Sequence, residues 1–173
     1  MPTPSQVKSD RVSFSIGSFE WLSHYGLPVG FLTIGFIGFY SLVKDWIGEN
    51  QINVLFLKFN FPLLLIGILA YCLQSKKLQF KSFILKGTKE SKRELIRKVL
   101  VEEGWNIEYD NQKVLIANCD RVFFCEQLIL KYNDDGMLWT SINHPANHNS
   151  LASLICRMKK SKEIISKLEK VYG

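Results

Sequence analysis

Two long apolar stretches dominate the first half of the chain, and a mixed apolar and polar pattern fills the second half. The first stretch, residues 27–43, reads LPVGFLTIGFIGFYSLV and carries no charge. The second, residues 54–73, reads VLFLKFNFPLLLIGILAYCL and carries one charge, Lys58. A membrane-spanning helix needs roughly 17 to 25 mostly apolar residues. The pattern therefore predicts two transmembrane helices that form a hairpin, with residues 44–53 as their connection.

The alternative is a pair of buried helices in a soluble protein. It is disfavoured because about 100 remaining residues cannot cover two helices that are apolar all round. A cleavable signal peptide is disfavoured too, since residues 1–26 are mostly polar and no A-x-A site follows the first stretch. We expect residues 1–11 to be disordered. Trp21 and Tyr25 are expected in the aromatic belt at the membrane interface.

Residues 74–173 have the alternating pattern of a small soluble domain. Ser91 and Glu94 predict a capping box at the start of an amphipathic helix, and Gly104 is expected to end that helix. The predicted elements after it are strands at 105–109, 113–118, about 122–132 and 137–142, and a helix over about 150–172.

These elements predict a cytoplasmic α+β domain of the order α-β-β-β-β-α. Its antiparallel sheet would carry both helices on one face. Residues 78–85 alternate and either add a fifth strand or join the second apolar helix to the domain.

Small residues in both apolar stretches indicate close helix packing. Gly30 and Gly38 lie in the first stretch and Gly67 in the second. Small side chains let membrane helices approach one another closely. The contact is either within the hairpin or with a second copy or a larger membrane partner.

The net charge of +6 is unevenly distributed. Residues 76–98, directly after the second apolar stretch, hold nine basic and two acidic residues. Lysine and arginine near membrane ends stay on the cytoplasmic side, so both termini are expected in the cytoplasm. The basic cluster is either a topology signal alone or also a contact for anionic lipid headgroups. Its members nearest the membrane are Lys76, Lys77, Lys81 and Lys86.

The most distinctive polar segment is the loop 143–149, with Asn143, His144, Asn147 and His148. It is interpreted first as a structural loop because asparagine and proline favour turns. A partner or ligand contact and a metal or catalytic site remain the alternatives. No third metal ligand is adjacent in the sequence, so no metal is predicted.

A thiol–imidazole pair of Cys125 with His144 would be the simplest catalytic arrangement. Cys125 lies among apolar residues, which favours a buried structural thiol. Glycine-rich phosphate loops, CxxC pairs and HExxH motifs are absent from the sequence. We therefore expect no cofactor and assign no catalytic residue.

The remaining patterns exclude other classes of protein. Cys72, Cys119, Cys125 and Cys156 lack the spacing of a metal site and are interpreted as reduced thiols. The basic residues near the C-terminus lack the interleaved aromatic residues typical of nucleic-acid binding, so nucleic acid is not expected as a partner.

The overall plan resembles bacterial pleckstrin-homology-like membrane proteins, in which a membrane hairpin carries one cytoplasmic module. Those modules have more strands and a single final helix. The resemblance therefore implies an architecture and assigns no functional residue.

Our leading hypothesis is a membrane-anchored, non-enzymatic accessory or scaffold subunit. It would be a multi-pass protein of a cell membrane, of the bacterial inner-membrane type. Its partners would be the lipid bilayer and a protein partner or further copies of the chain. The alternatives are a membrane-bound enzyme that uses Cys125, His144 or His148, and a sensor of anionic lipid or ligand that uses residues 76–98.

Overall fold

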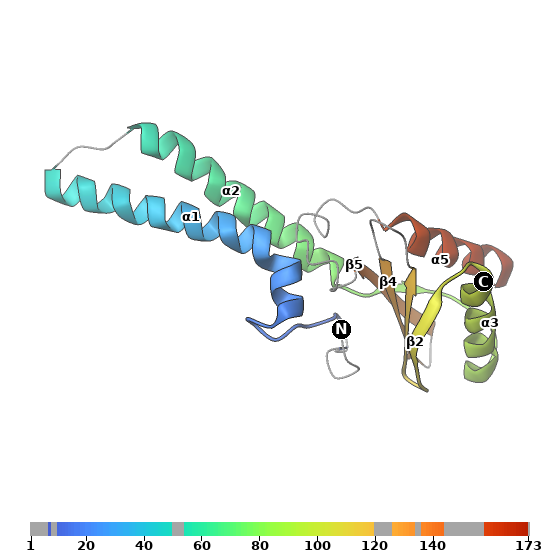
Figure 1. The fold of residues 1–173 in the computed structure, drawn as a ribbon. Helices are drawn as coiled ribbons and strands as arrows, with labels where there is room; N and C mark the ends of the chain where they lie inside the picture. Colours follow the sequence, from blue (N-terminus) through green and yellow to red (C-terminus); the bar gives the residue numbers. More distant parts are fainter. Residues whose placement is uncertain are drawn as a thin grey trace.

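The computed structural model describes residues 7, 10–49, 54–119, 126–133, 136–143 and 158–172. These residues form four helices and a five-stranded antiparallel sheet (Figure 1). The helices are α1 (Phe19–Glu49), α2 (Val54–Lys77), α3 (Lys89–Glu102) and α5 (Lys159–Tyr172). The strands are β1 (Lys81–Phe83), β2 (Asn106–Asp110), β3 (Val114–Cys119), β4 (Glu126–Asn133) and β5 (Gly136–Asn143).

Helices α1 and α2 lie side by side as a hairpin that extends away from the sheet (Figure 1). Both are long and apolar enough to span a membrane. The first helix is longer at both ends than its apolar stretch. It begins near Ser18, whose hydroxyl accepts the Trp21 N–H at 3.2 Å, and it runs to Glu49. Residues 44–49 therefore belong to the helix and not to the connection, because charged residues end an apolar stretch without ending a helix.

The sheet has the strand order β1-β5-β4-β3-β2, with every neighbouring pair antiparallel. Strands β2 to β5 follow one another as a meander. Strand β1 lies at the edge beside β5, where Lys81 pairs with Trp139 and Phe83 with Met137. The alternating segment after α2 thus provides a fifth strand.

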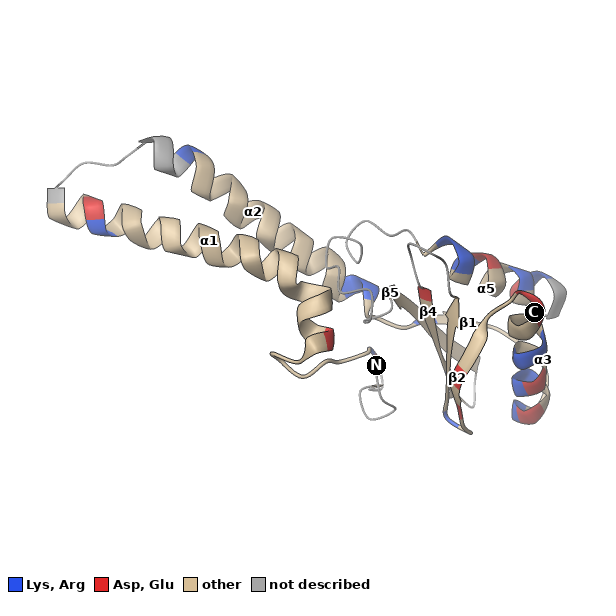
Figure 2. Ribbon diagram, in the orientation of Figure 1, with Lys and Arg blue, Asp and Glu red and all other residues tan. Residues whose placement is uncertain are grey.

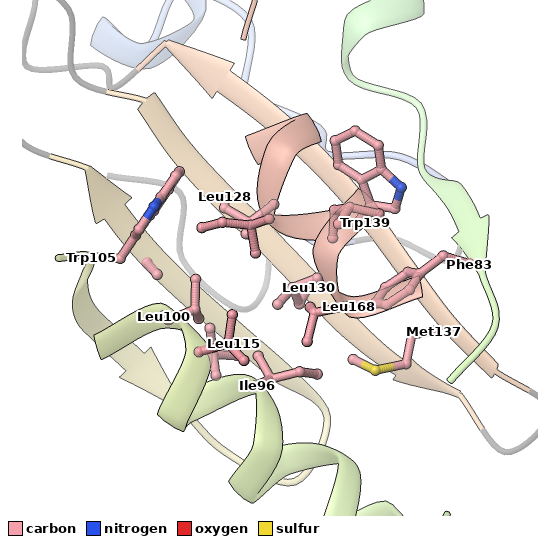
Figure 3. Close-up of a cluster of buried hydrophobic side chains, with 14 of the residues drawn as sticks. Phe83, Ile96, Leu100, Trp105, Leu115, Leu128, Leu130, Met137, Trp139 and Leu168 are labelled. Carbon is pink, nitrogen blue, oxygen red and sulfur yellow. The ribbon is translucent and has the colours of Figure 1, made fainter. Parts of the chain in front are cut away.

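Helices α3 and α5 cover one face of the sheet and enclose the larger core (Figure 3). Leu128 and Leu130 of the central strand β4 are fully buried there, as are Leu100 of α3 and Leu168 of α5. Helix α3 starts one turn earlier than predicted. Thr88 is its N-cap and accepts the Ser91 N–H, so Ser91 lies in the first turn and is not the cap.

The end of α3 follows the prediction. Gly104 comes directly after the C-cap and has a φ of +74°. This left-handed conformation suits glycine, which lacks a Cβ.

The predicted final helix over 150–172 is only partly correct. Helix α5 begins at Lys159, and Met158 just before it has a φ of +45°. A left-handed residue cannot continue a right-handed helix, so a single helix through Met158 is excluded. Helical spacing of apolar residues did not reveal this break, because it depends on backbone conformation. Residues 144–157 lie outside the described part.

The second face of the sheet packs against the N-terminal segment and the base of the hairpin. The Val12 N–H donates to the Leu78 carbonyl at 3.0 Å, and the Phe80 N–H donates to the Asp10 carbonyl at 3.0 Å. Val12 is fully buried in a cluster that includes Phe14, Leu78 and Ile129. Disorder, expected for residues 1–11, is therefore wrong for positions 10 and 11.

Tyr25 belongs to the same cluster. Only 7% of it is exposed, so it packs inside the protein and does not lie in the predicted interfacial belt. The sequence placed it next to an apolar stretch, but the return of the N-terminal segment to the sheet covers it.

Candidate functional site

The predicted loop site is described only at its first residue. Asn143 ends β5, is buried and pairs across the sheet with Glu126. His144, Asn147 and His148 lie outside the described residues, and so does Cys125. The loop and the thiol–imidazole pair therefore stay predictions.

At this end of the sheet a carboxylate from β4 holds the start of α5. Glu126 is buried, and its Oε2 accepts the Ser161 N–H at 3.0 Å and the Ser161 hydroxyl at 2.9 Å. The Ser161 hydroxyl also lies 2.7 Å from that of Ser141 on β5. The partial positive charge of a helix N-terminus stabilises a carboxylate at this position. Glu126 thus caps α5 from another element.

Cys119 pairs with Glu126 across the sheet and is buried. Within the ranges that the structure describes, no group of three His, Cys, Asp or Glu side chains is arranged to hold a metal ion.

A second polar group lies on the opposite face of the sheet. The Asn118 side-chain amide donates to Glu108 Oε2 at 2.9 Å, and the Gln127 amide donates to Asn118 Oδ1 at 3.0 Å and to Glu108 Oε2 at 3.2 Å. These bonds connect β2, β3 and β4. Sequence alternation did not reveal them, since they depend on strand register.

The basic cluster after α2 divides over several elements (Figure 2). Lys76 and Lys77 end α2 at the junction of hairpin and sheet, and the Lys77 carbonyl accepts the Thr140 hydroxyl at 2.8 Å. The Lys81 ammonium lies over the Trp139 ring, 5.4 Å from its centre. Lys86 is exposed before α3. Lys76 and Lys77 therefore lie at the junction, whereas Lys81 and Lys86 belong to the domain.

The junction itself is tied by side chains that sequence analysis did not identify. The distance from Nε2 of His24 in α1 to the carbonyl oxygen of Gln74 in α2 is 3.1 Å. The Tyr25 and Ser75 hydroxyls are 3.2 Å apart, and the Tyr25 ring packs 4.9 Å from that of Tyr71. Because His24 and Tyr25 are about 50 positions from their partners, no local pattern indicates these contacts.

Glycines allow the two hairpin helices to approach closely along most of their length. A Cβ at Gly38 would overlap the Asn60 side chain, and one at Gly67 would lie 2.9 Å from Leu32 Cγ. Gly35, which sequence analysis did not select, similarly faces Leu64 at 2.5 Å. A Cβ at Gly30 would meet no atom within 4 Å, so Gly30 makes no close contact inside the hairpin.

The Gly38 contact gives a testable prediction. Gly38→Ala is expected to lower the free energy of unfolding by about 1–3 kcal/mol, because the added methyl group overpacks the interface at Asn60. Thermal unfolding in detergent measures the loss. Gly30→Ala is the matched control and should show no loss.

A double mutant separates this clash from other effects. Since Asn60→Ala removes the overlapping atoms, the double variant should lose less stability than the two single variants together. Strict additivity would show that Gly38 and Asn60 do not pack as described.

Comparison with protein-family models, with curated proteins and with solved structures found no match to this chain.

Proposed function

We propose that this chain is a membrane-anchored, non-enzymatic accessory or scaffold subunit. In this proposal α1 and α2 span a cell membrane of the bacterial inner-membrane type, and the α+β domain binds a protein partner at the cytoplasmic face. The observation that carries the proposal is the hairpin, which projects from the domain and presents large apolar side chains on its outside.

The composition of the hairpin surface supports insertion into lipid. Phe36 is 63% exposed and Tyr40 72%, and residues 21–43 and 59–75 contain no Lys, Arg, Asp or Glu. Soluble monomers rarely expose contiguous apolar patches larger than a few hundred Å². In a bilayer the same side chains would contact acyl chains and avoid water.

The distribution of charge supports a cytoplasmic domain. Lys76 and Lys77 lie at the end of the hairpin next to the sheet, whereas Lys44 and Asp45 lie near its far end (Figure 2). The bias of lysine and arginine near membrane ends favours the cytoplasm for the sheet side. The described segments nearest the two chain ends, residues 10–18 and α5, lie on this side of the hairpin (Figure 1).

The hydrogen-bonded junction between the hairpin and the α+β domain supports a scaffold role. The hydrogen bond from Thr140 of β5 to the Lys77 carbonyl ties the sheet to the end of α2, and the one from Val12 to the Leu78 carbonyl ties the N-terminal segment to the residue after α2. A domain held in this way presents the same surface at the same height above the bilayer, which favours docking of a partner because less freedom is lost on binding.

Cysteine labelling tests the topology. In a chain whose native cysteines are replaced by alanine, Lys162→Cys reports the domain and Gly48→Cys reports the far end of α1. Both positions are exposed. In intact cells a membrane-impermeant maleimide should label Gly48→Cys, and it should label Lys162→Cys only after permeabilisation. Labelling of Lys162→Cys in intact cells would exclude a cytoplasmic domain.

Purification in mild detergent tests the partner. The tagged chain should retain a protein partner or form a defined oligomer, measured by mass spectrometry of the eluate and by light scattering. A monodisperse monomer that brings down no reproducible partner would contradict the scaffold role and leave the topology result unaffected.

A further inference from the structure

A pocket opens beside the first turn of α3, on the side of the domain away from the hairpin. Its volume is about 330 Å³, and its lining residues are Lys89, Glu90, Arg93, Gln112 and Tyr132. This size is at the lower end of the range for small-molecule sites. The lining comes from α3, from the β2–β3 turn and from the end of β4, so only folding brings these residues together.

Tyr132 supplies the most informative atom of this pocket. Only 6% of the residue is exposed, and its hydroxyl is buried without a hydrogen-bond partner. A buried polar group left unpaired costs free energy and is uncommon in native proteins. Tyr132 also lines the pocket, so a ligand bound there can satisfy this hydroxyl once a neighbouring side chain moves aside.

Tyr132 is available as a donor at neutral pH. Burial raises the pKa of its hydroxyl, and the negative charge of Asp110 raises it further, against the smaller opposing effects of Arg93 and Arg97. The phenol thus keeps its proton and can donate a hydrogen bond to an anion.

The start of α3 provides a second feature that suits an anion. Thr88 caps the helix, with its carbonyl accepting the Lys92 N–H at 2.9 Å and its hydroxyl the Ser91 N–H at 3.3 Å. The backbone N–H groups of Lys89 and Glu90 come before that of Ser91 in the chain, and they have no hydrogen-bond partner within the helix. A helix N-terminus carries a partial positive charge and binds phosphate groups readily.

The charged side chains around the pocket leave a positive balance. Arg93 donates from Nε to Asp110 Oδ1 at 2.7 Å, and Arg97 pairs with the other oxygen of the same carboxylate. Two guanidinium groups therefore neutralise Asp110. Lys89 adds a further cation to the lining, against the single carboxylate of Glu90.

We propose that this pocket binds the phosphate group of a small, soluble phosphorylated molecule, with the Tyr132 hydroxyl, the Lys89 ammonium and the first turn of α3 as donors. Several donors from different directions suit the three terminal oxygens of a phosphate group. The ligand is soluble because α3 lies at the end of the molecule opposite the hairpin, away from the proposed membrane surface (Figure 1). This site is additional to the proposed partner-binding role and does not depend on it.

The test uses the full chain in neutral detergent and inorganic phosphate as the probe, with chloride at matched ionic strength as the reference. A ligand that binds only the folded state raises the melting temperature. Phosphate also stabilises proteins generally by exclusion from their surface, and this effect raises all variants alike. The decisive quantity is therefore the difference between variants.

Tyr132→Phe is expected to weaken phosphate binding about tenfold or more, since hydrogen bonds to charged groups are among the stronger ones. Without phosphate this variant should melt no lower than the parent chain, because the lost hydroxyl has no partner. Lys89→Gln should also weaken binding. Lys98→Gln removes the same charge from an exposed position of the same helix and is the matched control, with binding retained.

Three outcomes would overturn the proposal. The first is an equal phosphate effect in the parent chain and in Tyr132→Phe, and the second is no effect beyond chloride in the parent chain. The third comes from a parallel binding assay with vesicles that contain phosphatidylglycerol, and it is a response to these vesicles without any response to inorganic phosphate. The last outcome would assign the anion to a lipid surface.

Discussion

Replacing Val12 with aspartate is expected to release the N-terminal segment from the sheet and to lower the free energy of unfolding by about 3–5 kcal/mol. Val12 is fully buried between the second face of the sheet and the base of the hairpin. An aspartate there would be an uncompensated buried charge. Leaving the sheet avoids that cost and breaks the hydrogen bond from the backbone of residue 12 to Leu78.

Two measurements report the effect of Val12→Asp. Thermal or denaturant unfolding of the full chain in detergent gives the loss of stability. Limited trypsin digestion reports the release of the N-terminal segment from the domain. Trypsin can cleave after Arg11 only when the backbone of this segment has separated from Leu78 and Gln79.

Ile16→Asp is the matched control in the same segment. Ile16 is 87% exposed, so the same new charge should change stability by less than about 0.5 kcal/mol. If Val12→Asp were as stable and as protease-resistant as Ile16→Asp, the N-terminal segment would not hold the junction together. The proposal of a rigid, membrane-anchored scaffold would then lose its structural support.

Leu130→Ala is expected to lower the free energy of unfolding of the domain by about 2–5 kcal/mol. Leu130 is fully buried at the centre of β4, in the core that α3 and α5 share (Figure 3). Truncation removes apolar contacts and leaves a cavity that a sheet covered by two helices cannot close. Denaturant unfolding of the full chain measures the loss, with the fluorescence of Trp105 and Trp139 as probes in the same core.

Val101→Ala serves as the control for Leu130→Ala. Val101 lies on the outer side of α3 and is 64% exposed, so its truncation should change stability by less than about 0.5 kcal/mol. Equal losses for the two variants would mean that α3 and α5 do not enclose the core described here.

The candidate sites show the limits of sequence patterns. The polar loop stood out because histidine and asparagine cluster within seven positions, but only Asn143 of that loop is described. The Tyr132 pocket gave no local signal, because Lys89, Gln112 and Tyr132 are far apart in the sequence. Their meeting depends on strand register and on how α3 lies against the sheet.

By itself the sequence determined the elements whose signal is local. Two long apolar stretches, one of them with the single charge of Lys58, specify two long helices because length and hydropathy are properties of the segment alone. Alternation specifies the meander β2 to β5, and Gly104 ends α3 through its own backbone conformation.

Only the tertiary structure decided what covers the second face of the sheet and how the hairpin joins the domain. Those contacts link Val12 with Leu78 and Thr140 with Lys77, pairs separated by more than sixty positions. Their free energy depends on burial and hydrogen bonding between segments, which no local pattern contains. Gly38 illustrates both the local and the tertiary contribution. Its small size was evident from the sequence, whereas its contact with Asn60 was evident only from the packed hairpin.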